Sequence, residues 1–415
     1  MADFPFNVDE ADPNSPALTA GGRTYTYGEL VTDVITKAEE VSKKTIFFCT
    51  DDKPYESIVT YLACLKAKVC VGIMPKGMDM ASLDDFRALM MKARPALIIS
   101  TSGSTGSKKF VKLTLANVMA NCEAICKSLP IQQSDIAGLM LPISYSYGLS
   151  VINTHLFKHA HICVMTTPFG SKVFWKELTD KKITSLALVP SHLVALKLGF
   201  FEMSLPKVLR YITLAGGALD RGGLLKIEAV IQRGPAAYVM YGQTEATARI
   251  TCLPSEMFKT KRGSVGKPIA GELSLDPETQ EIIYDGPNVS MGYATTPQEL
   301  YVWTERTRLR TGDIGRLDAD GYLWITGRLK RIAKINSQRV SLDELERILS
   351  DRHDDVIIKC VSDDKLVYCC STEDIPRPND MLVGSIVMVK LEEFPMTSTG
   401  KTDYVKLLEA ACSRS

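Results

Sequence analysis

Short apolar stretches alternate with amphipathic ones from residue 45 to residue 214, and few folds can accommodate this alternation. The apolar stretches have the length of strands, and the amphipathic stretches have the spacing of helices. The predicted strands are residues 45–49, 69–73, 96–100, 136–141, 160–165, 184–189 and 208–214, and the predicted helices are residues 54–67, 80–93, 115–129, 148–158, 172–181 and 191–198. Such alternation is typical of α/β proteins, in which helices cover both faces of mostly parallel sheets.

The pattern changes near residue 263, where short predicted strands are separated by turns. This change predicts a small β-rich subdomain over residues 263–329, and a charged segment, Arg328-Leu329-Lys330-Arg331, follows it. The strands predicted from residue 263 onward are residues 272–275, 281–284, 322–325, 332–335, 356–361 and 366–370, and the helices are residues 342–349 and the segment from residue 404. We therefore expect a large N-terminal domain, residues 1–329, followed by a small α+β domain, residues 330–415.

The composition is that of an ordinary globular protein without a strong charge. Lys and Arg number 49 against 48 Asp and Glu, so the net charge of +1 gives no reason to expect nucleic acid as a partner. The longest apolar stretch, residues 185–201, is interrupted by Pro190, His192 and Lys197, which argues against a membrane span. The 11 cysteines are odd in number and irregularly spaced, which predicts reduced thiols and a cytoplasmic protein.

The segment between the predicted strand 96–100 and an apolar stretch at residues 110–114 has the composition of a phosphate-binding loop. Glycines let backbone N–H groups turn towards an anion, hydroxyl groups add donors and lysine adds charge. The residues of this kind are Thr101, Ser102, Gly103, Ser104, Thr105, Gly106, Ser107, Lys108 and Lys109. The two glycines are too close for a Walker loop, and a strand rather than a helix follows. A flexible Ser/Gly linker is the alternative, but two apolar strands rarely bracket a linker.

Two further glycine-containing segments also follow predicted strands. They are Ala215-Gly216-Gly217-Ala218 and Tyr241-Gly242-Gln243-Thr244-Glu245. Ligands of parallel α/β sheets bind where loops leave the carboxyl ends of the strands. We therefore expect these two segments and the phosphate-binding loop to line one cleft.

Five short segments stand in a fixed order along the chain: residues 101–109 (TSGSTGSKK), 241–245 (YGQTE), 310–313 (RTGD), 327–334 (GRLKRIAK) and 395–401 (PMTSTGK). Together, in this order, they closely resemble the adenylate-forming superfamily, which comprises acyl-CoA synthetases, adenylation domains of peptide synthetases and firefly luciferase. The resemblance runs from about residue 100 to residue 401. It implies ATP-dependent activation of a small carboxylic acid as an acyl-adenylate, with release of pyrophosphate.

The resemblance also implies roles at the phosphate end of an ATP site. A carboxylate oxygen must attack the α-phosphorus of ATP, and both groups are anionic, so catalysis depends on positioning and positive charge. Thr244 is expected to contact the α-phosphate and Glu245 to hold Mg²⁺, which bridges phosphate oxygens. The residues expected to hold the β- and γ-phosphates are Ser102, Ser104, Thr105 and Lys109, within the loop that also contains Thr101, Gly103 and Gly106.

At the adenosine end, the resemblance implies that Tyr241 offers a flat face to adenine. Asp313 is expected to accept hydrogen bonds from the ribose hydroxyls, and Arg328 to bond there as well. Gly216 and Gly217 are expected to let the backbone approach the base closely, and Ala218 and Gly242 are further expected ATP-binding residues.

The small domain is expected to supply Lys401, which reaches the reacting carboxylate and the α-phosphate. Members of the family rotate this domain about a hinge after the adenylate forms, and Lys330 matches the hinge position. The resemblance therefore implies a mobile C-terminal domain.

The family segment that lines the acyl pocket corresponds to Leu141–Gly148, within which Tyr145, Ser146, Tyr147 and Gly148 are the expected pocket residues. Adenylation domains for α-amino acids usually place an aspartate there to pair with the ammonium group. This stretch has no acidic residue, and a buried ammonium needs a counter-charge, so we expect a carboxylic acid without an amino group.

Several alternatives stay open at this point. The acceptor of the acyl group is expected to be a thiol, either CoA or the pantetheine of an acyl or peptidyl carrier protein, whereas an amine acceptor, a stand-alone amino-acid adenylation enzyme and a non-catalytic nucleotide-binding module are the other readings. Taken singly, Glu245 could cap a helix, Asp313 could be a turn residue, Tyr241 could be core and Lys401 could be solvated. The chain departs from the family's usual residues at Lys108, Phe110 and Ser337.

Overall fold

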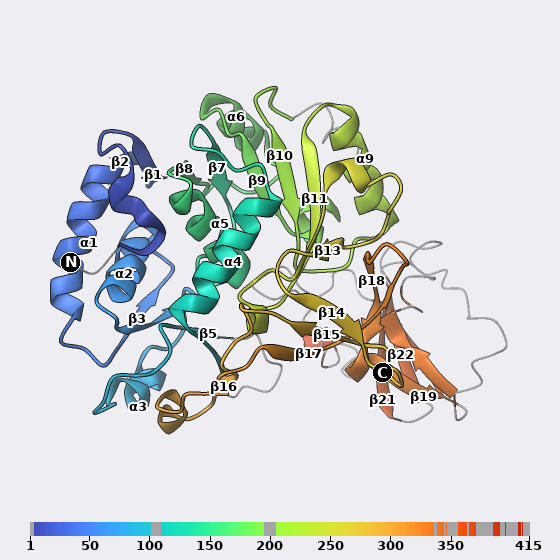
Figure 1. Ribbon diagram of the computed structural model, residues 1–415. Coiled ribbons are helices and arrows are strands. Elements are labelled where there is room, and N and C mark those ends of the chain that lie inside the picture. Colours follow the sequence, from blue (N-terminus) through green and yellow to red (C-terminus); the bar gives the residue numbers. More distant parts are fainter. Residues whose placement is uncertain are drawn as a thin grey trace.

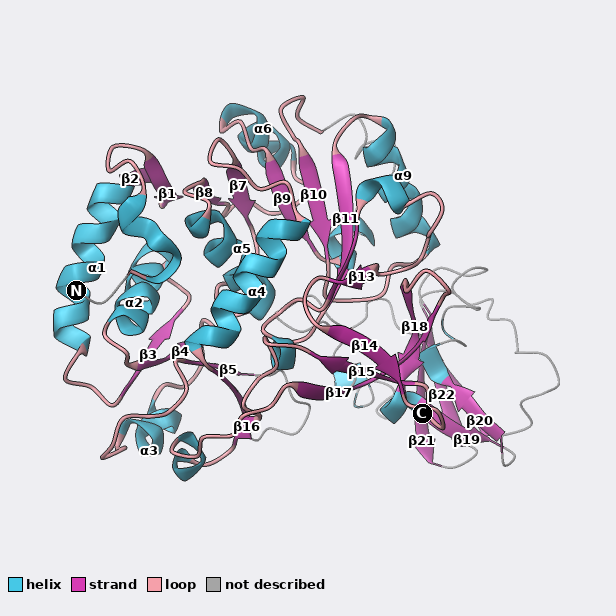
Figure 2. Ribbon diagram, viewed as in Figure 1, coloured by secondary structure: helices cyan, strands magenta, loops and turns pink. Residues whose placement is uncertain are grey.

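The structure is a computed structural model that describes residues 4–100, 109–194, 205–335, 338–343, 346, 356–362, 365–370, 385–390, 395, 406, 407 and 409. Its strands form sheets of nine, five, four, three and two strands (Figure 1). Helices surround the two largest sheets (Figure 2). The mixed α/β class predicted for the chain is confirmed.

The nine-stranded sheet contains most of the predicted parallel strands. Its order is β13-β12-β11-β10-β9-β7-β8-β1-β2, and the strands from β11 to β1 in this order run parallel, whereas β13, β12 and β2 pair antiparallel. The bounds are β1 Pro16–Ala20, β2 Arg23–Thr26, β7 Ile136–Leu139, β8 His161–Val164, β9 Ser185–Leu188, β10 Tyr211–Leu214, β11 Ala236–Tyr241, β12 Thr251–Leu253 and β13 Lys267–Pro268. Because β10 and β11 are parallel neighbours, the segments that follow them leave the same edge of the sheet.

The five-stranded sheet carries the predicted phosphate-binding loop. Its order is β16-β6-β5-β4-β3, with bounds β3 Ile46–Thr50, β4 Cys70–Met74, β5 Leu97–Ser100, β6 Phe110–Leu113 and β16 Tyr293–Ala294. Strands β5 and β6 pair antiparallel, with Ser100 opposite Phe110. The prediction that two strands bracket residues 101–109 is therefore confirmed, although residues 101–108 lie outside the described part of the chain.

A helix that is buried on every side joins the two large sheets. Helix α5 (Ser146–Phe157) has buried residues along its whole length from Ser146 to Leu156. Its apolar side chains share one core with Leu97 of β5 and Leu139 of β7, so both sheets pack against it. Figure 1 shows α5 and α4 (Leu115–Ser128) in the space between the sheets. A helix that is buried all round needs no charged face, and α5 contains no Asp, Glu, Lys or Arg.

The remaining helices of the described chain are α1 Tyr27–Val41, α2 Pro54–Lys66, α3 Asp84–Arg87, α6 Lys172–Asp180, α7 Pro190–Val194 and α9 Arg221–Gln232. Helix α2 shares the buried core of α5, whereas α6 and α9 pack on the other face of the nine-stranded sheet (Figure 2). Single 3₁₀ turns are η1 Pro5–Glu10, η2 Ala81–Leu83, η3 Thr244–Ala246, η4 Ser255–Met257, η5 Pro297–Leu300 and η6 Leu329–Arg331. Among the residues that the structure describes, no helix combines the length and the apolarity that a membrane crossing requires.

An antiparallel four-stranded sheet follows the large sheets, as the change of pattern near residue 263 predicted. Its order is β14-β15-β17-β18, with bounds Glu272–Leu275, Glu281–Asp285, Arg308–Leu317 and Leu323–Arg328. Ile282, Tyr284 and Leu323 of this sheet pack against Tyr241 at the end of β11. Beyond it lie β19 Ile332–Ile335, β20 Gln338–Ser341, β21 Val356–Ser362, β22 Lys365–Cys370 and β23 Ser385–Lys390.

In the first 100 residues, the sequence analysis was wrong about one helix and missed one helix and one hairpin. The helix predicted over residues 80–93 is only η2 and α3, and it ends at Arg87. Leu83, Phe86 and Leu89 are buried, but Met90 and Met91 are 95% and 61% exposed, so the apolar pattern beyond Leu89 does not face a core. The sequence reasoning also missed α1 and the β1–β2 hairpin. The capping box of Thr26 with Glu29 at the start of α1 is a local signal that could have identified the helix.

We predict that Thr114→Ala destabilises the fold by about 1 kcal/mol, because it removes an N-cap. The Thr114 hydroxyl accepts a hydrogen bond from the Asn117 N–H at 3.0 Å, and the Asn117 side chain accepts one in return from the Thr114 N–H at 3.0 Å. This capping box orients the start of α4 directly after β6. Urea unfolding would measure the loss. Thr114→Ser is the control that keeps the hydroxyl, and equal unfolding midpoints for Ala and Ser would contradict the prediction.

Candidate active site

Three residues expected at the adenosine end of a nucleotide site come together. The Tyr241 hydroxyl, at the end of β11, donates a hydrogen bond to Asp313 Oδ2 at 2.7 Å. Arg328 Nε lies 3.4 Å from Asp313 Oδ1, and the two residues are paired across β17 and β18. Burial and the nearby Asp313 carboxylate raise the pKa of Tyr241 well above its ordinary value, so its hydroxyl stays a neutral donor. The end of β11 in the nine-stranded sheet and the four-stranded sheet therefore meet at Asp313.

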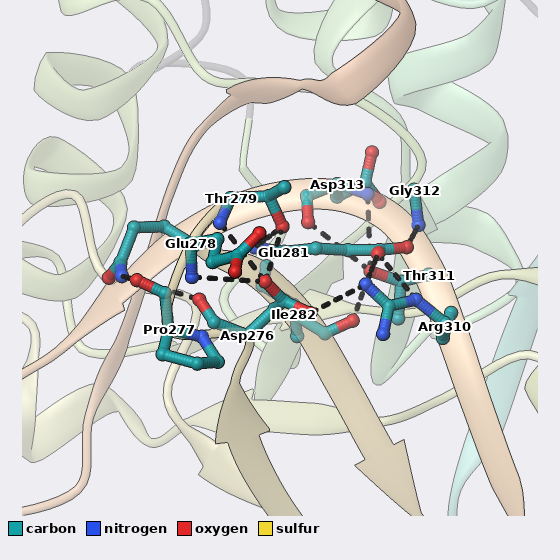
Figure 3. Close-up of polar contacts among 11 residues, drawn as sticks. Asp276, Pro277, Glu278, Thr279, Glu281, Ile282, Arg310, Thr311, Gly312 and Asp313 are labelled. Carbon is teal, nitrogen blue, oxygen red and sulfur yellow. Dashed lines mark hydrogen bonds and ion pairs between the residues drawn. The ribbon is translucent and has the colours of Figure 1, made fainter.

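Residues 310–313, the irregular part of β17 that carries Asp313, are fastened to β15 by backbone and side-chain contacts (Figure 3). The Thr311 hydroxyl donates to the Ile282 carbonyl at 2.8 Å and accepts from the Asp313 N–H at 3.1 Å. Gly312 has φ of +74°, a left-handed conformation that suits glycine, and its N–H donates to Glu281 Oε1 at 2.9 Å. These contacts hold the Asp313 carboxylate towards Tyr241.

Arg310 joins this part of β17 to two carboxylates (Figure 3). Its Nε donates to Glu281 Oε2 at 2.8 Å, and its Nη2 donates to Asp276 Oδ2 at 2.8 Å. The Arg310 hydrogen bond, with further donors from Thr279, holds the pKa of Asp276 well below its usual range. The sequence analysis gave Arg310 no individual role within the segment 310–313. The structure shows that Arg310 supports the part of β17 that carries Asp313.

Of the residues expected at the phosphate end, those that the structure describes also lie close to one another. Thr244 and Glu245 form the 3₁₀ turn η3 directly after β11, and Thr244 Oγ1 lies 3.1 Å from Ser146 Oγ at the start of α5. The Tyr293 hydroxyl donates to Glu245 Oε1 at 2.7 Å. Lys109 Nζ lies 3.5 Å from the centre of the Tyr293 ring. The end of the phosphate-binding loop therefore reaches Glu245 through Tyr293.

Tyr293 is a site residue that the sequence reasoning missed. It belongs to β16, which pairs with β6, so it brings the five-stranded sheet against the end of β11. Burial and the hydrogen bond to Glu245 raise the pKa of Tyr293, which keeps it a donor. Glu245 fits a magnesium ligand, because a carboxylate is the oxygen donor that Mg²⁺ prefers and a hydrogen bond to one oxygen orients the group. Nothing in the local sequence of Tyr293 indicated this role, because it depends on the pairing of β16 with β6.

The glycines of the predicted site are required by close approaches. A Cβ on Gly216, which has φ of +95°, would lie 2.6 Å from the Tyr145 hydroxyl oxygen. A Cβ on Gly242 would lie 2.0 Å from the Ala248 carbonyl oxygen. Gly217 and Ala218 lie in the same loop after β10, where a Cβ on Gly217 would approach Pro190 to 3.3 Å. The backbone is therefore closely packed at both segments, and its approach to a nucleotide stays a prediction.

The expected acyl-pocket residues lie at the start of α5. A Cβ on Gly148 would lie 2.3 Å from the Pro142 carbonyl oxygen, so glycine is required there. The Tyr147 hydroxyl lies 2.8 Å from Thr213 Oγ1, and the Arg249 guanidinium lies 3.8 Å from the centre of the Tyr147 ring. Arg249 is a second residue that the sequence reasoning missed, because nothing in its local sequence places it in this pocket.

Lys330 lies in the single 3₁₀ turn η6 between β18 and β19, which agrees with a connecting position. The turn is held on both sides by Asp343, whose carboxylate accepts from the Arg328 N–H at 2.8 Å and lies 2.7 Å from Arg331 Nε. The hinge itself stays a prediction.

The expected residues that lie outside the described part of the chain are Thr101, Ser102, Gly103, Ser104, Thr105, Gly106 and Lys401.

Known proteins resemble this chain in sequence and in fold. Oxalate–CoA ligase of Arabidopsis thaliana is 30% identical over 269 residues, 61% of this chain and 52% of that protein. Sulfoacetate–CoA ligase of Cupriavidus necator is 29% identical over 273 residues, 63% of this chain and 53% of that protein. The chain thus spans about half the length of the curated relatives that it matches.

The fold is also that of a solved enzyme. O-succinylbenzoate coenzyme A synthetase of Bacillus subtilis, solved in complex with its acyl-adenylate intermediate, superposes with a TM-score of 0.80 at 18% identity and covers 98% of each chain. The same enzyme has been solved with ATP and a magnesium ion, again with a TM-score of 0.80. At this identity the likeness concerns the fold alone. The sequence model of the AMP-binding enzyme family matches residues 83–294, just over half of the chain. This chain therefore belongs to the AMP-binding enzymes.

Proposed function

We propose that this protein is an ATP-dependent, AMP-forming carboxylate ligase. It activates a carboxylic acid as an acyl-adenylate, releases pyrophosphate and transfers the acyl group to a thiol. The observation that carries the proposal is the position of the segment 241–245. Its first residue, Tyr241, bonds to Asp313, and its last, Glu245, bonds to Tyr293 beside Lys109. One short segment thus spans an adenosine end and a phosphate end.

In this function the described residues position two anionic reactants. Asp313 has two carboxylate oxygens with several acceptor sites, so it can accept from ribose hydroxyls while Tyr241 and Arg328 hold its orientation. Thr244 and Lys109 donate to phosphate oxygens, and Glu245 holds Mg²⁺, which supplies positive charge to those oxygens. Ser146, beside Thr244, orients the acid at the mouth of the acyl pocket. Lys401, in the C-terminal domain, supplies a further positive charge to the reacting carboxylate and the α-phosphate.

The acceptor that we propose is CoA, because the curated relatives are named as CoA ligases. The pantetheine of a carrier protein presents the same thiol, so it is the alternative.

We divide the chain into a domain of residues 1–329, with its β-rich part over residues 263–329, and a mobile domain of residues 330–415. We also propose a cytoplasmic location, because the 11 irregularly spaced cysteines suit a reducing compartment.

The test of this function is release of pyrophosphate from ATP in the presence of a panel of carboxylic acids, followed by detection of the acyl-CoA product.

We predict that Lys401→Ala slows adenylate formation by a factor of about 10² to 10³, the usual loss when one charge-assisted contact to a developing transition state is removed. ATP binding and the unfolding temperature should stay nearly unchanged. Unaltered pyrophosphate exchange in the variant would remove Lys401 from the mechanism.

We predict that Glu245→Gln shifts the magnesium dependence of turnover to higher concentration, because an amide oxygen is a weaker ligand for Mg²⁺ than a carboxylate oxygen. Tyr293→Phe is the matched variant, since it removes the hydrogen bond to Glu245 but keeps the carboxylate. It should shift the magnesium titration less than Glu245→Gln. An unchanged titration in Glu245→Gln would favour a purely structural role at the η3 turn.

We predict that Lys330→Pro leaves adenylate formation largely intact and slows acyl transfer to the thiol. A hinge concentrates large changes of φ and ψ in a few residues at the ends of elements, and proline forbids most of that change. Single-turnover kinetics of the two half-reactions would separate the effects. Lys330→Ala is the control, because it removes the charge but leaves the backbone free. Equal slowing of both half-reactions, or of neither, would rule out a hinge at Lys330.

A further inference from the structure

Arg249 is a buried cation that has no counter-charge among the described residues. Its residue is 2% exposed, and it is among the largest fully buried side chains of the described chain. Its guanidinium lies against the Tyr147 ring at 3.8 Å, and its Nε contacts Met240 Sδ at 3.4 Å. Its Nη1 is buried and has no hydrogen-bond partner among the described residues. A guanidinium keeps its charge in proteins, and a buried charge without a partner is strongly unfavourable.

The backbone before Arg249 is held in an unusual conformation. Thr247 and Ala248 have φ of 53° and 91°, in the left-handed region that β-branched and other non-glycine residues rarely adopt. The Arg249 carbonyl accepts hydrogen bonds from the Asn121 side chain at 2.8 Å and from the Asn288 side chain at 3.0 Å. These contacts fix the direction in which Arg249 projects. Strained backbone that surrounding contacts hold in place is typical of functional sites.

Arg249 lines a cavity between α5 and the nine-stranded sheet. The cavity is small, about 20 Å³, and the polar groups around it include Ser150, Thr213, Ser185 and His155. Burial lowers the pKa of His155, which makes it neutral near pH 7. The Asp135 carboxylate near this end of the sheet is paired with Arg210. Within the described part of the chain, the cavity therefore offers no anion to Arg249.

A second small cavity lies next to the first, on the side of the residues proposed to hold the reacting carboxylate. It is about 10 Å³ in size and is lined by Ser146 and Thr247, and the two cavities share Ile125 and Ser150 as lining residues. Ser146 Oγ lies 3.1 Å from Thr244 Oγ1, the proposed α-phosphate contact. An acid whose carboxylate lies at Thr244 would therefore direct the rest of its chain along α5 towards Arg249.

We propose that Arg249 pairs with a second anionic group on the acid, so that the substrate is a dicarboxylate or an acid with an equivalent second anion. This inference rests on the proposed function for the orientation of the acid. A guanidinium matches a carboxylate with two parallel hydrogen bonds, and the unpartnered Nη1 supplies one of these donors. An alternative role for Arg249 is to support the Tyr147 ring without contacting the substrate.

The experiment compares matched acids with one and two carboxylates: butanoate with succinate, pentanoate with glutarate, and hexanoate with adipate. Binding is measured by calorimetry without ATP, and adenylation is measured by pyrophosphate exchange. The proteins are the wild type, Arg249→Met, Arg249→Lys and the control Arg262→Met. Arg262 is an exposed arginine, 3.5 Å from Glu228, outside the proposed site.

We predict that at least one dicarboxylate binds to the wild type and reacts about 100-fold better than its monocarboxylate partner, a typical effect of a buried charge pair. Arg249→Met should remove this preference by lowering kcat/KM for the dicarboxylate about 100-fold, without lowering it for the monocarboxylate. Arg249→Lys should keep part of the preference, and Arg262→Met should keep all of it. A variant that only loses support for Tyr147 would instead lose activity on both acids equally.

A wild type that prefers monocarboxylates, or that binds no dicarboxylate, would overturn the inference. So would an unchanged preference in Arg249→Met. If that variant does not fold, as circular dichroism would reveal, the wild-type preference and Arg249→Lys decide the question. Binding of a dicarboxylate that depends on Arg249, without pyrophosphate exchange for any acid, would contradict the proposed function but support the inference. Pyrophosphate exchange with monocarboxylates alone would support the proposed function but contradict the inference.

Discussion

The burial of α5 on every side is the packing constraint on which the rest of the structure depends. Its residues from Ser146 to Leu156 are buried, and its apolar side chains share one core with both large sheets. The first turn of the helix cannot move without disturbing that core, since protein interiors are closely packed. Ser146 therefore meets Thr244 and Tyr147 meets Arg249 at fixed positions. Because both sheets pack around this helix, the helix sets the geometry of the proposed acyl pocket.

The segment from Tyr241 to Arg249 connects the regions of the candidate site. It begins at the carboxyl end of β11, where Tyr241 contacts Asp313 of the four-stranded sheet. It continues through Glu245, which contacts Tyr293 of the five-stranded sheet, and ends at Arg249 in the cavity beside α5. Three sheets thus converge on nine residues. Gly242 permits the close approach to Ala248 that folds the segment back on itself.

Much of the fold could be predicted because buried parallel strands are nearly continuous apolar runs. The strand predicted over residues 69–73 is β4, Cys70–Met74, and the helix predicted over residues 115–129 is α4, Leu115–Ser128. The helix predicted over residues 80–93 was wrong beyond Arg87, because an apolar side chain such as Met90 indicates a buried face only where a core exists to receive it. Helix α1 was missed although its capping box was visible in the sequence.

The sequence by itself determined the family, through five segments in a fixed order, and it indicated Tyr241, Asp313 and Arg328 as parts of one site. Only the tertiary structure decided which further residues join them. Tyr293, Arg310 and Arg249 carry no local signal of their roles, since each acts by contacting residues that are distant or unremarkable in sequence. Local patterns record how a segment meets solvent and core, whereas the partner of a buried charge or a tyrosine hydroxyl depends on how the sheets pack.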